Sequence, residues 1–98
     1  MAGLRKRFGP LKKATNSNIE KLPEGPGVYG LFTDAGTNIY IGKVKRYRAD
    51  DRVMEHKKEG KIPFKKVGFI PTKTQEEALR LEQRLIKQRK PRYNKDGK

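Results

Sequence analysis

Two short runs carry the strongest structural signal in this 98-residue chain: Gly27-Val-Tyr-Gly-Leu-Phe-Thr33 and, four residues later, Asn38-Ile-Tyr-Ile-Gly-Lys-Val44. Both are rich in β-branched and aromatic residues, and a turn segment with a glycine separates them, so a β-hairpin is expected over residues 27–44. Because side chains alternate along a strand, Tyr29 and Tyr40 share one face of this hairpin if its register allows.

A helix and a third strand are expected after the hairpin. Asp50 or Asp51 can cap a helix that runs to about Lys58 and is ended by Gly60. Residues 64–70 suggest a strand, which the proline that follows them would stop.

The last helix is the clearest element of the sequence. Thr74 and Glu77 form the pattern of a capping box, so a helix is predicted over residues 75–89. At about 100° per residue, Glu82 falls near the middle of an apolar arc. The arc consists of Ala78, Leu79, Leu81, Leu85 and Ile86.

The position of Glu82 calls for an explanation. A carboxylate that faces the core costs several kcal/mol unless it is paired, hydrogen-bonded or bound to a metal. Two interpretations stay open on these grounds: a structural ion pair with a partner such as Arg52, and a functional site. His56 is the only histidine and cysteine is absent, so a metal would rest on carboxylate and water, which favours Mg²⁺ or Mn²⁺.

Charge indicates the class of partner. The chain has 25 Lys and Arg residues against 11 Asp and Glu residues, a net charge of +14, which favours binding to a nucleic acid. Residues 1–21 are expected to form a basic amino-terminal arm ahead of a single domain, residues 22–98. The candidate nucleic-acid contacts are Lys43, Lys45, Arg46, Arg48, Lys87 and Arg89.

Three features argue against a membrane or secreted protein. No run approaches the roughly 18 apolar residues of a membrane span, and the basic start of the chain is not followed by the apolar run of a signal peptide. Without cysteine, the chain needs no oxidising compartment. A soluble, cytoplasmic protein is therefore expected, and the sequence leaves its oligomeric state open.

Several of these residues also occur in the order that is typical of a known family. The segment Leu22-Pro-Glu-Gly-Pro-Gly-Val-Tyr29, followed after ten residues by Tyr40-Ile-Gly-Lys43, is similar to the paired signature of the GIY-YIG nuclease superfamily. Residues 77–87 and Pro91-Arg-Tyr-Asn94 are similar to its carboxy-terminal part. Over residues 22–94 the chain most resembles the amino-terminal nuclease domain of UvrC-type excision-repair endonucleases.

The resemblance implies a divalent-metal-dependent DNA endonuclease that hydrolyses phosphodiester bonds. Tyr29, activated by His56, is expected to help deprotonate the attacking water, and Tyr40 is expected at the scissile phosphate. Arg52 and one Mg²⁺ or Mn²⁺ ion on Glu82 would supply positive charge. A tyrosine with a pKa near ~10 is a poor base at neutral pH, so the surrounding cations are expected to lower that pKa.

The resemblance also implies supporting residues, namely Gly42, Lys43 and Asn94. The connection before the second helix is about two residues longer than in the repair enzymes, so Arg46 or Arg48 is an alternative to Arg52. Arg52 is preferred because its four-residue step to His56 is kept, which places both on one helical face. In this resemblance Glu82 matches the metal-binding glutamate of the family, which would explain its place on the apolar face.

The expected fold is α/β (α+β): a small, mostly antiparallel three-stranded sheet flanked by helices in the order β-β-α-β-α, with the pairing beyond the hairpin implied by the resemblance. Two alternatives to an active endonuclease stay open. One is a noncatalytic basic nucleic-acid-binding module, and the other is a nuclease subunit that depends on a protein partner for target selection.

Overall fold

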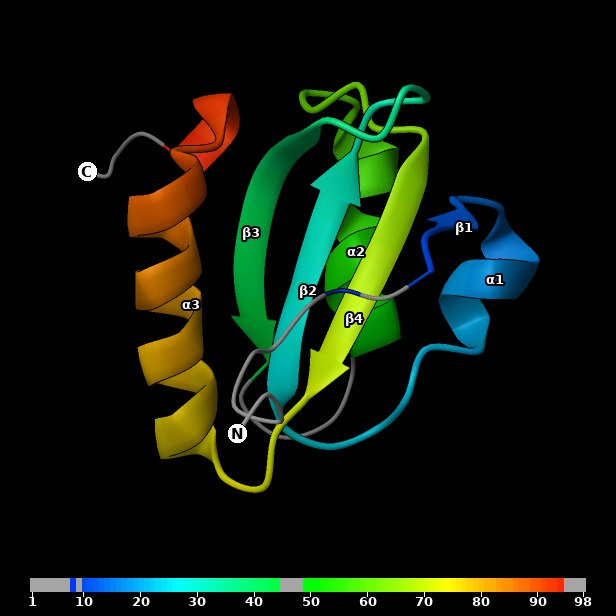
Figure 1. Ribbon diagram of the computed structural model, residues 1–98. Helices are drawn as coiled ribbons and strands as arrows, with labels where there is room; N and C mark the ends of the chain where they lie inside the picture. Colours follow the sequence, from blue (N-terminus) through cyan, green and yellow to red (C-terminus); the bar gives the residue numbers. More distant parts are fainter. Residues whose placement is uncertain (1–7, 9, 45–48, 95–98) are drawn as a thin grey trace.

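Four β-strands and three α-helices make up the part of the chain that the structure, a computed structural model, describes: residue 8, residues 10–44 and residues 49–94 (Figure 1). The elements are β1 (Lys12–Lys13), α1 (Asn16–Glu20), β2 (Gly27–Phe32), β3 (Asn38–Val44), α2 (Ala49–Glu59), β4 (Lys66–Pro71), α3 (Gln75–Arg89) and a short 3-10 helix, η2 (Arg92–Asn94). The expected mixed fold with an antiparallel sheet is confirmed.

The sheet has the strand order β1-β4-β2-β3, and every neighbouring pair is antiparallel. Its central strand β2 pairs with both β3 and β4, so Tyr29 lies between Gly42 on one side and Phe69 on the other. The expectation of three strands is corrected to four, because Lys12 and Lys13 pair with β4. A strand of two lysines is too short to show the alternation by which a sequence reveals a strand.

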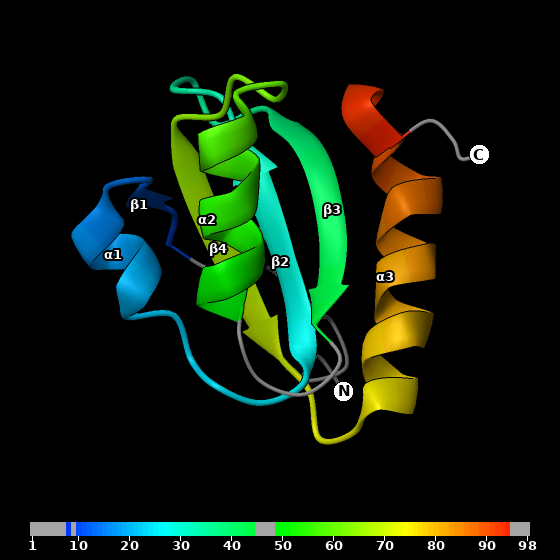
Figure 2. The same ribbon diagram turned by 180° about the vertical axis from the view of Figure 1, so that it is seen from behind.

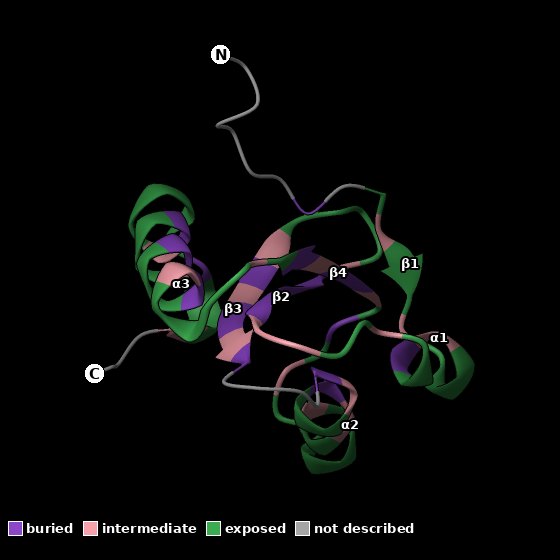
Figure 3. Cartoon of the chain, turned by 90° about the horizontal axis from the view of Figure 1, so that it is seen from below, coloured by how far each residue is buried: buried purple, intermediate pink, exposed green. Residues whose placement is uncertain are grey.

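Helices cover both faces of the sheet (Figure 2). On one face α2 packs over the strands with α1 beside it, and this layer of the core includes Tyr29, Leu31, Val53 and Val67. On the other face α3 packs against β3 and β2, over a second layer that includes Val28, Phe32, Ile41, Leu81 and Leu85. Figure 3 shows the buried positions on the sheet and on the inner sides of the helices. The edge strand β3 therefore has a helix on each side.

The last helix follows its sequence signals closely. The hydroxyl of Thr74 accepts a hydrogen bond from the amide of Glu77 at 3.0 Å, as a capping residue should. The Glu77 carboxylate accepts from the amide of Lys73 at 2.8 Å, one residue earlier than a strict capping box requires. One residue of the predicted apolar arc differs: Leu79 is 38% exposed, because it lies at the border of the face that contacts the sheet.

Part of the segment that we expected to be a basic arm belongs to the folded core. The Phe8 ring lies over Gly30 and Gly68, which face each other across β2 and β4, and a Cβ on Gly30 would approach that ring to 2.9 Å. The same ring meets Phe32 edge-to-face with 5.3 Å between centroids. Ile19 of α1 is fully buried against the α2 layer. The density of positive charge conceals these widely spaced apolar side chains in the sequence.

The burial of Ile19 makes a direct prediction about stability. We expect Ile19→Ala to lower the free energy of unfolding by about 3 kcal/mol, since it removes a buried side chain from a packed layer. Urea denaturation followed by circular dichroism measures this change. The control, Leu79→Ala at a partly exposed site, should cost less than about 1 kcal/mol. Equal small losses from both variants would show that α1 does not contribute to the core.

Candidate active site

A tyrosine and a histidine from opposite sides of the core meet at the centre of the candidate site. The Tyr29 ring leaves β2 and lies across the backbone of Gly42 on β3, where any Cβ atom would overlap its Cζ and Oη atoms. Beyond Gly42, the Tyr29 hydroxyl is 3.0 Å from Nε2 of His56, which comes from α2. Glycine is required at position 42 because the tyrosine ring occupies the space of a side chain.

Tyr40 completes an aromatic cluster on the same face of the sheet, as the alternation of the hairpin predicts. Its ring centroid is 4.8 Å from that of His56 and 6.1 Å from that of Tyr29. Tyr40 is only half-buried, whereas Tyr29 is fully buried. The cluster thus has an inner phenol and an outer phenol, and the outer one is accessible to a ligand.

A β-bulge in β3 lies directly before Tyr40 and changes the face to which Ile39 points. Leu31 pairs with Tyr40 and Phe32 pairs with Asn38, so Ile39 is an extra residue in β3. The bulge places Ile39 in the α2 layer, although strict alternation predicts that it shares a face with Ile41. Asn38, which was not among the predicted site residues, donates from its side-chain amide at 3.1 Å to the carbonyls of Leu31 and Tyr40. An asparagine inside a run of β-forming residues is the signal that could have indicated it.

Arg52 lies one helical turn before His56 and faces the same tyrosine. Its guanidinium interacts electrostatically with Tyr29 and forms an ion pair with Glu55 at 3.2 Å. The Arg52 side chain is 53% exposed, so this positive charge stands at the mouth of the cluster. Arg46 and Arg48, the alternatives to Arg52, lie outside the described residues, as does Lys45.

The pKa of Tyr29, which faces His56, is shifted in the direction opposite to our expectation. Burial raises the pKa of the Tyr29 phenol well above its usual value of 10.0, and the nearby Tyr40 raises it further, while Arg52 lowers it by less. The expected lowering by cations is therefore wrong, because desolvation of the phenolate is the larger effect. Burial, followed by the positive charge of Arg52, lowers the pKa of His56 below 6.5. At neutral pH a protonated phenol thus faces a neutral imidazole.

Lys43 and Glu82 form a second group, on the α3 side of β3. Lys43 follows Gly42 in the strand and so points to the opposite face. Glu82 is half-buried on α3; desolvation raises the pKa of its carboxyl group, and the charge of Lys43 acts against this rise. The ion pair of Arg52 is with Glu55, which argues against the structural pairing of Glu82 with Arg52 that the sequence left open.

Glu82 belongs to no cluster of candidate metal ligands in the part of the chain that is described. Within residues 8, 10–44 and 49–94, no three His, Cys, Asp or Glu side chains gather where they could hold a metal ion. A single carboxylate suits Mg²⁺, which dehydrates reluctantly and is often bound by one or two carboxylates, water and substrate phosphate. The donor set therefore fits a largely hydrated hard ion.

Asn94 holds the free edge of β3. Its Oδ1 accepts a hydrogen bond from the Ile41 amide at 2.7 Å, and its Nδ2 donates to the Ile41 carbonyl at 2.8 Å. One side-chain amide thereby replaces a neighbouring strand and ties η2 to the strand that carries Tyr40 and Gly42. Of the other predicted nucleic-acid contacts, Lys87 and Arg89 are exposed on the last turns of α3, where the Arg89 guanidinium lies 5.5 Å from the centre of the Phe8 ring.

The site is thus an edge strand between two helices, with a tyrosine–histidine pair on one side and a half-buried carboxylate on the other. Residues 25–95 match the family described as the UvrC-like GIY-YIG domain, and the chain belongs to this family. The resemblance inferred from the sequence is thus confirmed.

Comparison with curated proteins identifies relatives that are much longer than this chain. The UvrABC system protein C of Agrobacterium fabrum is 36% identical over 83 residues, which are 78% of this chain and 12% of that protein. The UvrABC system protein C of Bacteroides thetaiotaomicron is 39% identical over 85 residues, 78% of this chain and 14% of that protein. The chain therefore corresponds to about one eighth of the length of these relatives.

Solved structures of a single domain match this chain over nearly their whole length. The GIY-YIG N-terminal endonuclease domain of UvrC from Thermotoga maritima, bound to magnesium as its catalytic divalent cation, is 30% identical with a TM-score of 0.66. The match covers 85% of this chain and 99% of that chain. A point mutant of the same domain, also bound to its catalytic divalent cation, gives 29% identity, a TM-score of 0.67, and coverage of 87% and 100%.

The charge of Arg52 beside His56 leads to a prediction that NMR can check. We expect the His56 pKa to lie below 6.5 and to rise in Arg52→Gln, without returning fully to 6.5 because burial is the larger cause. Titration of the imidazole nitrogens measures both values. Since the folded-state pKa is depressed, the contribution of neutral His56 to stability is present above pH 6.5 and is lost as the pH falls through the folded value. A His56 pKa above 6.5 in the unaltered chain would contradict the prediction.

The Asn94 bridge predicts a local effect on β3. We expect Asn94→Ala to speed hydrogen exchange at the Ile41 amide and to cost about 1 to 2 kcal/mol of stability, since two backbone groups lose their partner. Exchange followed by NMR measures the local effect and urea denaturation the global one. Gln88→Ala, at an exposed position of α3, is the control and should change neither. Unchanged exchange at Ile41 would mean that the bridge is not formed in solution.

Proposed function

We propose that this chain is a divalent-metal-dependent DNA endonuclease that hydrolyses phosphodiester bonds. The observation that carries the proposal is the 3.0 Å contact between the Tyr29 hydroxyl and Nε2 of His56, at an edge strand that also carries Tyr40. Neither group is charged at neutral pH in this environment, so the pair can pass a proton without first separating charge. Membership of the UvrC-like GIY-YIG family supports the assignment.

The proposed reaction begins with proton transfer along this pair. The Tyr29 oxygen takes a proton from the attacking water while its own proton passes to Nε2 of His56, so a free phenolate does not accumulate. This coupling matters because burial makes the phenolate of Tyr29 costly. The water oxygen forms a bond to phosphorus, the bond from phosphorus to the leaving oxygen breaks, and that oxygen takes up a proton from solvent. His56 then releases its proton to solvent, which restores the neutral imidazole.

The proposed roles of the other side chains follow from charge and exposure. Arg52 is cationic and half-exposed beside Tyr29, so it can stabilise the negative charge that grows on the phosphate oxygens. The half-buried Tyr40 can donate a hydrogen bond to the scissile phosphate. Glu82 would hold one Mg²⁺ or Mn²⁺ ion, which supplies Lewis-acid neutralisation of the phosphate when bound. Lys43, next to Glu82, adds positive charge to that side of β3.

DNA is the proposed substrate, and its backbone would be held by basic side chains. The net charge of +14 supports binding to a polyanion. The proposed contacts are Lys43, Lys87 and Arg89, together with Lys45, Arg46 and Arg48 from the connection that is not described. Because the curated relatives are named for the UvrABC system, we also propose that a protein partner contributes to target selection.

The compartment is proposed on the basis of the substrate. A DNA-cleaving activity agrees with the cytoplasmic location predicted from the sequence. No helix among the described residues is long and apolar enough to span a membrane.

The role of Glu82 provides the decisive test. Supercoiled plasmid is incubated with the protein, with and without Mg²⁺ or Mn²⁺, and nicked and linear products are measured. We expect metal-dependent cleavage that Glu82→Ala lowers by at least about 100-fold, since it removes the proposed metal ligand, with DNA binding nearly unchanged. Glu76→Ala, which removes an exposed carboxylate from the first turn of the same helix, is the matched control and should cleave normally.

Three other outcomes would lead to different conclusions. Cleavage by Glu82→Ala at the normal rate would refute the metal role. DNA binding without cleavage by either protein would favour a noncatalytic binding module. Cleavage that appears only after another protein is added would favour a partner-dependent subunit.

A further inference from the structure

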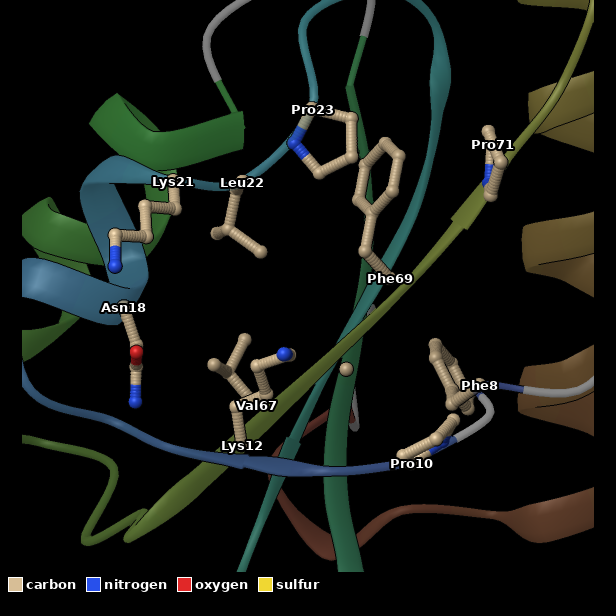
Figure 4. Close-up of a pocket in the computed structure, with 11 residues that line it drawn as sticks. Phe8, Pro10, Lys12, Asn18, Lys21, Leu22, Pro23, Val67, Phe69 and Pro71 are labelled. Carbon is tan, nitrogen blue, oxygen red and sulfur yellow. The ribbon is translucent and has the colours of Figure 1, made fainter.

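A cavity of about 390 Å³ opens beside β4 (Figure 4). In the sheet, β2 lies between β4 and the edge strand β3, so the cavity is on the far side of the sheet from β3. It lies between β4 and the segment that leads from α1 into β2. Its walls are mostly apolar and include Phe8, Leu22, Val67 and Phe69, with three prolines around them. Concave sites with apolar walls and a few polar groups are typical of ligand-binding pockets.

The cavity also exposes the edge of a β-strand. The amino-terminal segment pairs with β4 only at Lys12 opposite Val67 and Lys13 opposite Lys66. Before these pairs in the chain, Phe8 and Leu11 belong to the α3 layer, where Phe8 packs on Gly68. The rest of β4, from Gly68 to Pro71, therefore has no partner strand on this side among the described residues.

Strand geometry assigns the free hydrogen-bonding groups to Phe69. In an antiparallel pair, successive residues direct their amide and carbonyl groups to opposite sides. The amide of Thr72 donates to the Pro26 carbonyl at 3.0 Å, so even-numbered residues of β4 face β2. Phe69 pairs with Tyr29 and lies between Gly68 and Ile70, so its own backbone groups point away from β2. Phe69 thus directs its backbone amide and carbonyl toward the cavity, and its ring forms part of the wall.

The charges at the mouth of the cavity indicate what it can bind. The lysines Lys12 and Lys21 are exposed at its rim, and no described residue that lines it is acidic. An extended chain with negative charges can therefore satisfy the strand edge and the two lysines together, with an apolar side chain in the cavity. A nucleobase with its phosphates would also match the positive charge of the two lysines. However, it has no peptide groups that could pair with the backbone amide and carbonyl of Phe69.

We propose that this cavity binds an extended acidic segment of a partner protein by strand addition to β4. The backbone of the segment pairs with Phe69, one large apolar side chain inserts between Leu22, Val67 and Phe69, and its carboxylates lie against Lys12 and Lys21. The binding site is separate from the tyrosine–histidine pair, so a partner seated there leaves the β3 edge free for a substrate. The proposal concerns a different surface from the proposed nuclease site and does not require that activity.

The first experiment is an NMR titration of the ¹⁵N-labelled full chain with the capped peptide Asp-Glu-Leu-Phe-Glu-Asp. We expect saturable shifts in the amides of residues 68–70, and none at residues 40–42. A capped peptide Asp-Glu-Gly-Ser-Glu-Asp, which keeps the charge and lacks the apolar anchor, should not saturate. Absence of saturation by the first peptide up to about 1 mM would overturn the proposal. Shifts of residues 68–70 by a hexathymidylate and not by the peptide would assign the cavity to single-stranded nucleic acid instead.

Charge reversal supplies the matched comparison. We expect Lys12→Glu combined with Lys21→Glu to weaken peptide binding by about tenfold, and Lys58→Glu combined with Lys61→Glu, at exposed positions near the end of α2, by less than about twofold. Equal weakening of peptide binding by both pairs would show that only the net charge of the protein matters, and would refute a specific site. If the Lys12→Glu and Lys21→Glu pair disturbs β1, Lys12→Gln combined with Lys21→Gln takes its place in the test. This neutral pair introduces no repulsion and should give an intermediate loss of peptide binding.

Plasmid cleavage by the same variants keeps this proposal separate from the proposed nuclease activity. We expect both charge-reversed proteins to keep the same dependence on Mg²⁺, because neither pair belongs to the proposed catalytic group. Loss of peptide binding with cleavage retained supports a separate docking site. Peptide binding with no cleavage by any variant leaves the docking site established and rejects the nuclease proposal.

Discussion

The contact between the Tyr29 ring and the bare backbone of Gly42 is the constraint on which the site depends. Tyr29 starts on the central strand, and its hydroxyl reaches His56 only by passing over the neighbouring strand. A side chain at position 42 would fill this path. Burial follows from the same contact, and burial raises the pKa of the phenol and lowers that of the imidazole. The protonation states of the pair are thus a consequence of packing.

The edge position of β3 explains how the two groups of candidate residues can serve one substrate. A central strand would be covered by neighbours on both sides, whereas β3 has only β2 beside it in the described sheet. The aromatic cluster lies on its α2 side, and Lys43 and Glu82 lie on its α3 side. An exposed edge invites pairing with other chains, and the side chain of Asn94 satisfies the backbone there without adding a strand.

The amino-terminal segment shows how a strongly basic stretch can still be part of the core. Phe8 packs on two paired glycines and lies next to the guanidinium of Arg89, while Ile19 is buried in the core layer on the other face of the sheet. The same segment pairs with β4 for only two residues, and its Phe8 lies in the α3 layer. It therefore both completes the core and leaves the cavity beside Phe69, on the strand edge farthest from β3.

Sequence patterns were enough to predict the hairpin, the helix that begins at Thr74, the four-residue step from Arg52 to His56 and the family, because each depends on local periodicity or on residues at fixed spacing. The folded chain was needed to reveal the strand formed by two lysines, the bulge before Tyr40 and the burial of Phe8 and Ile19 in the basic segment. It also decided the direction of the Tyr29 pKa, since desolvation depends on which side chains surround the phenol. These properties arise from contacts between distant parts of the chain, which no local pattern encodes.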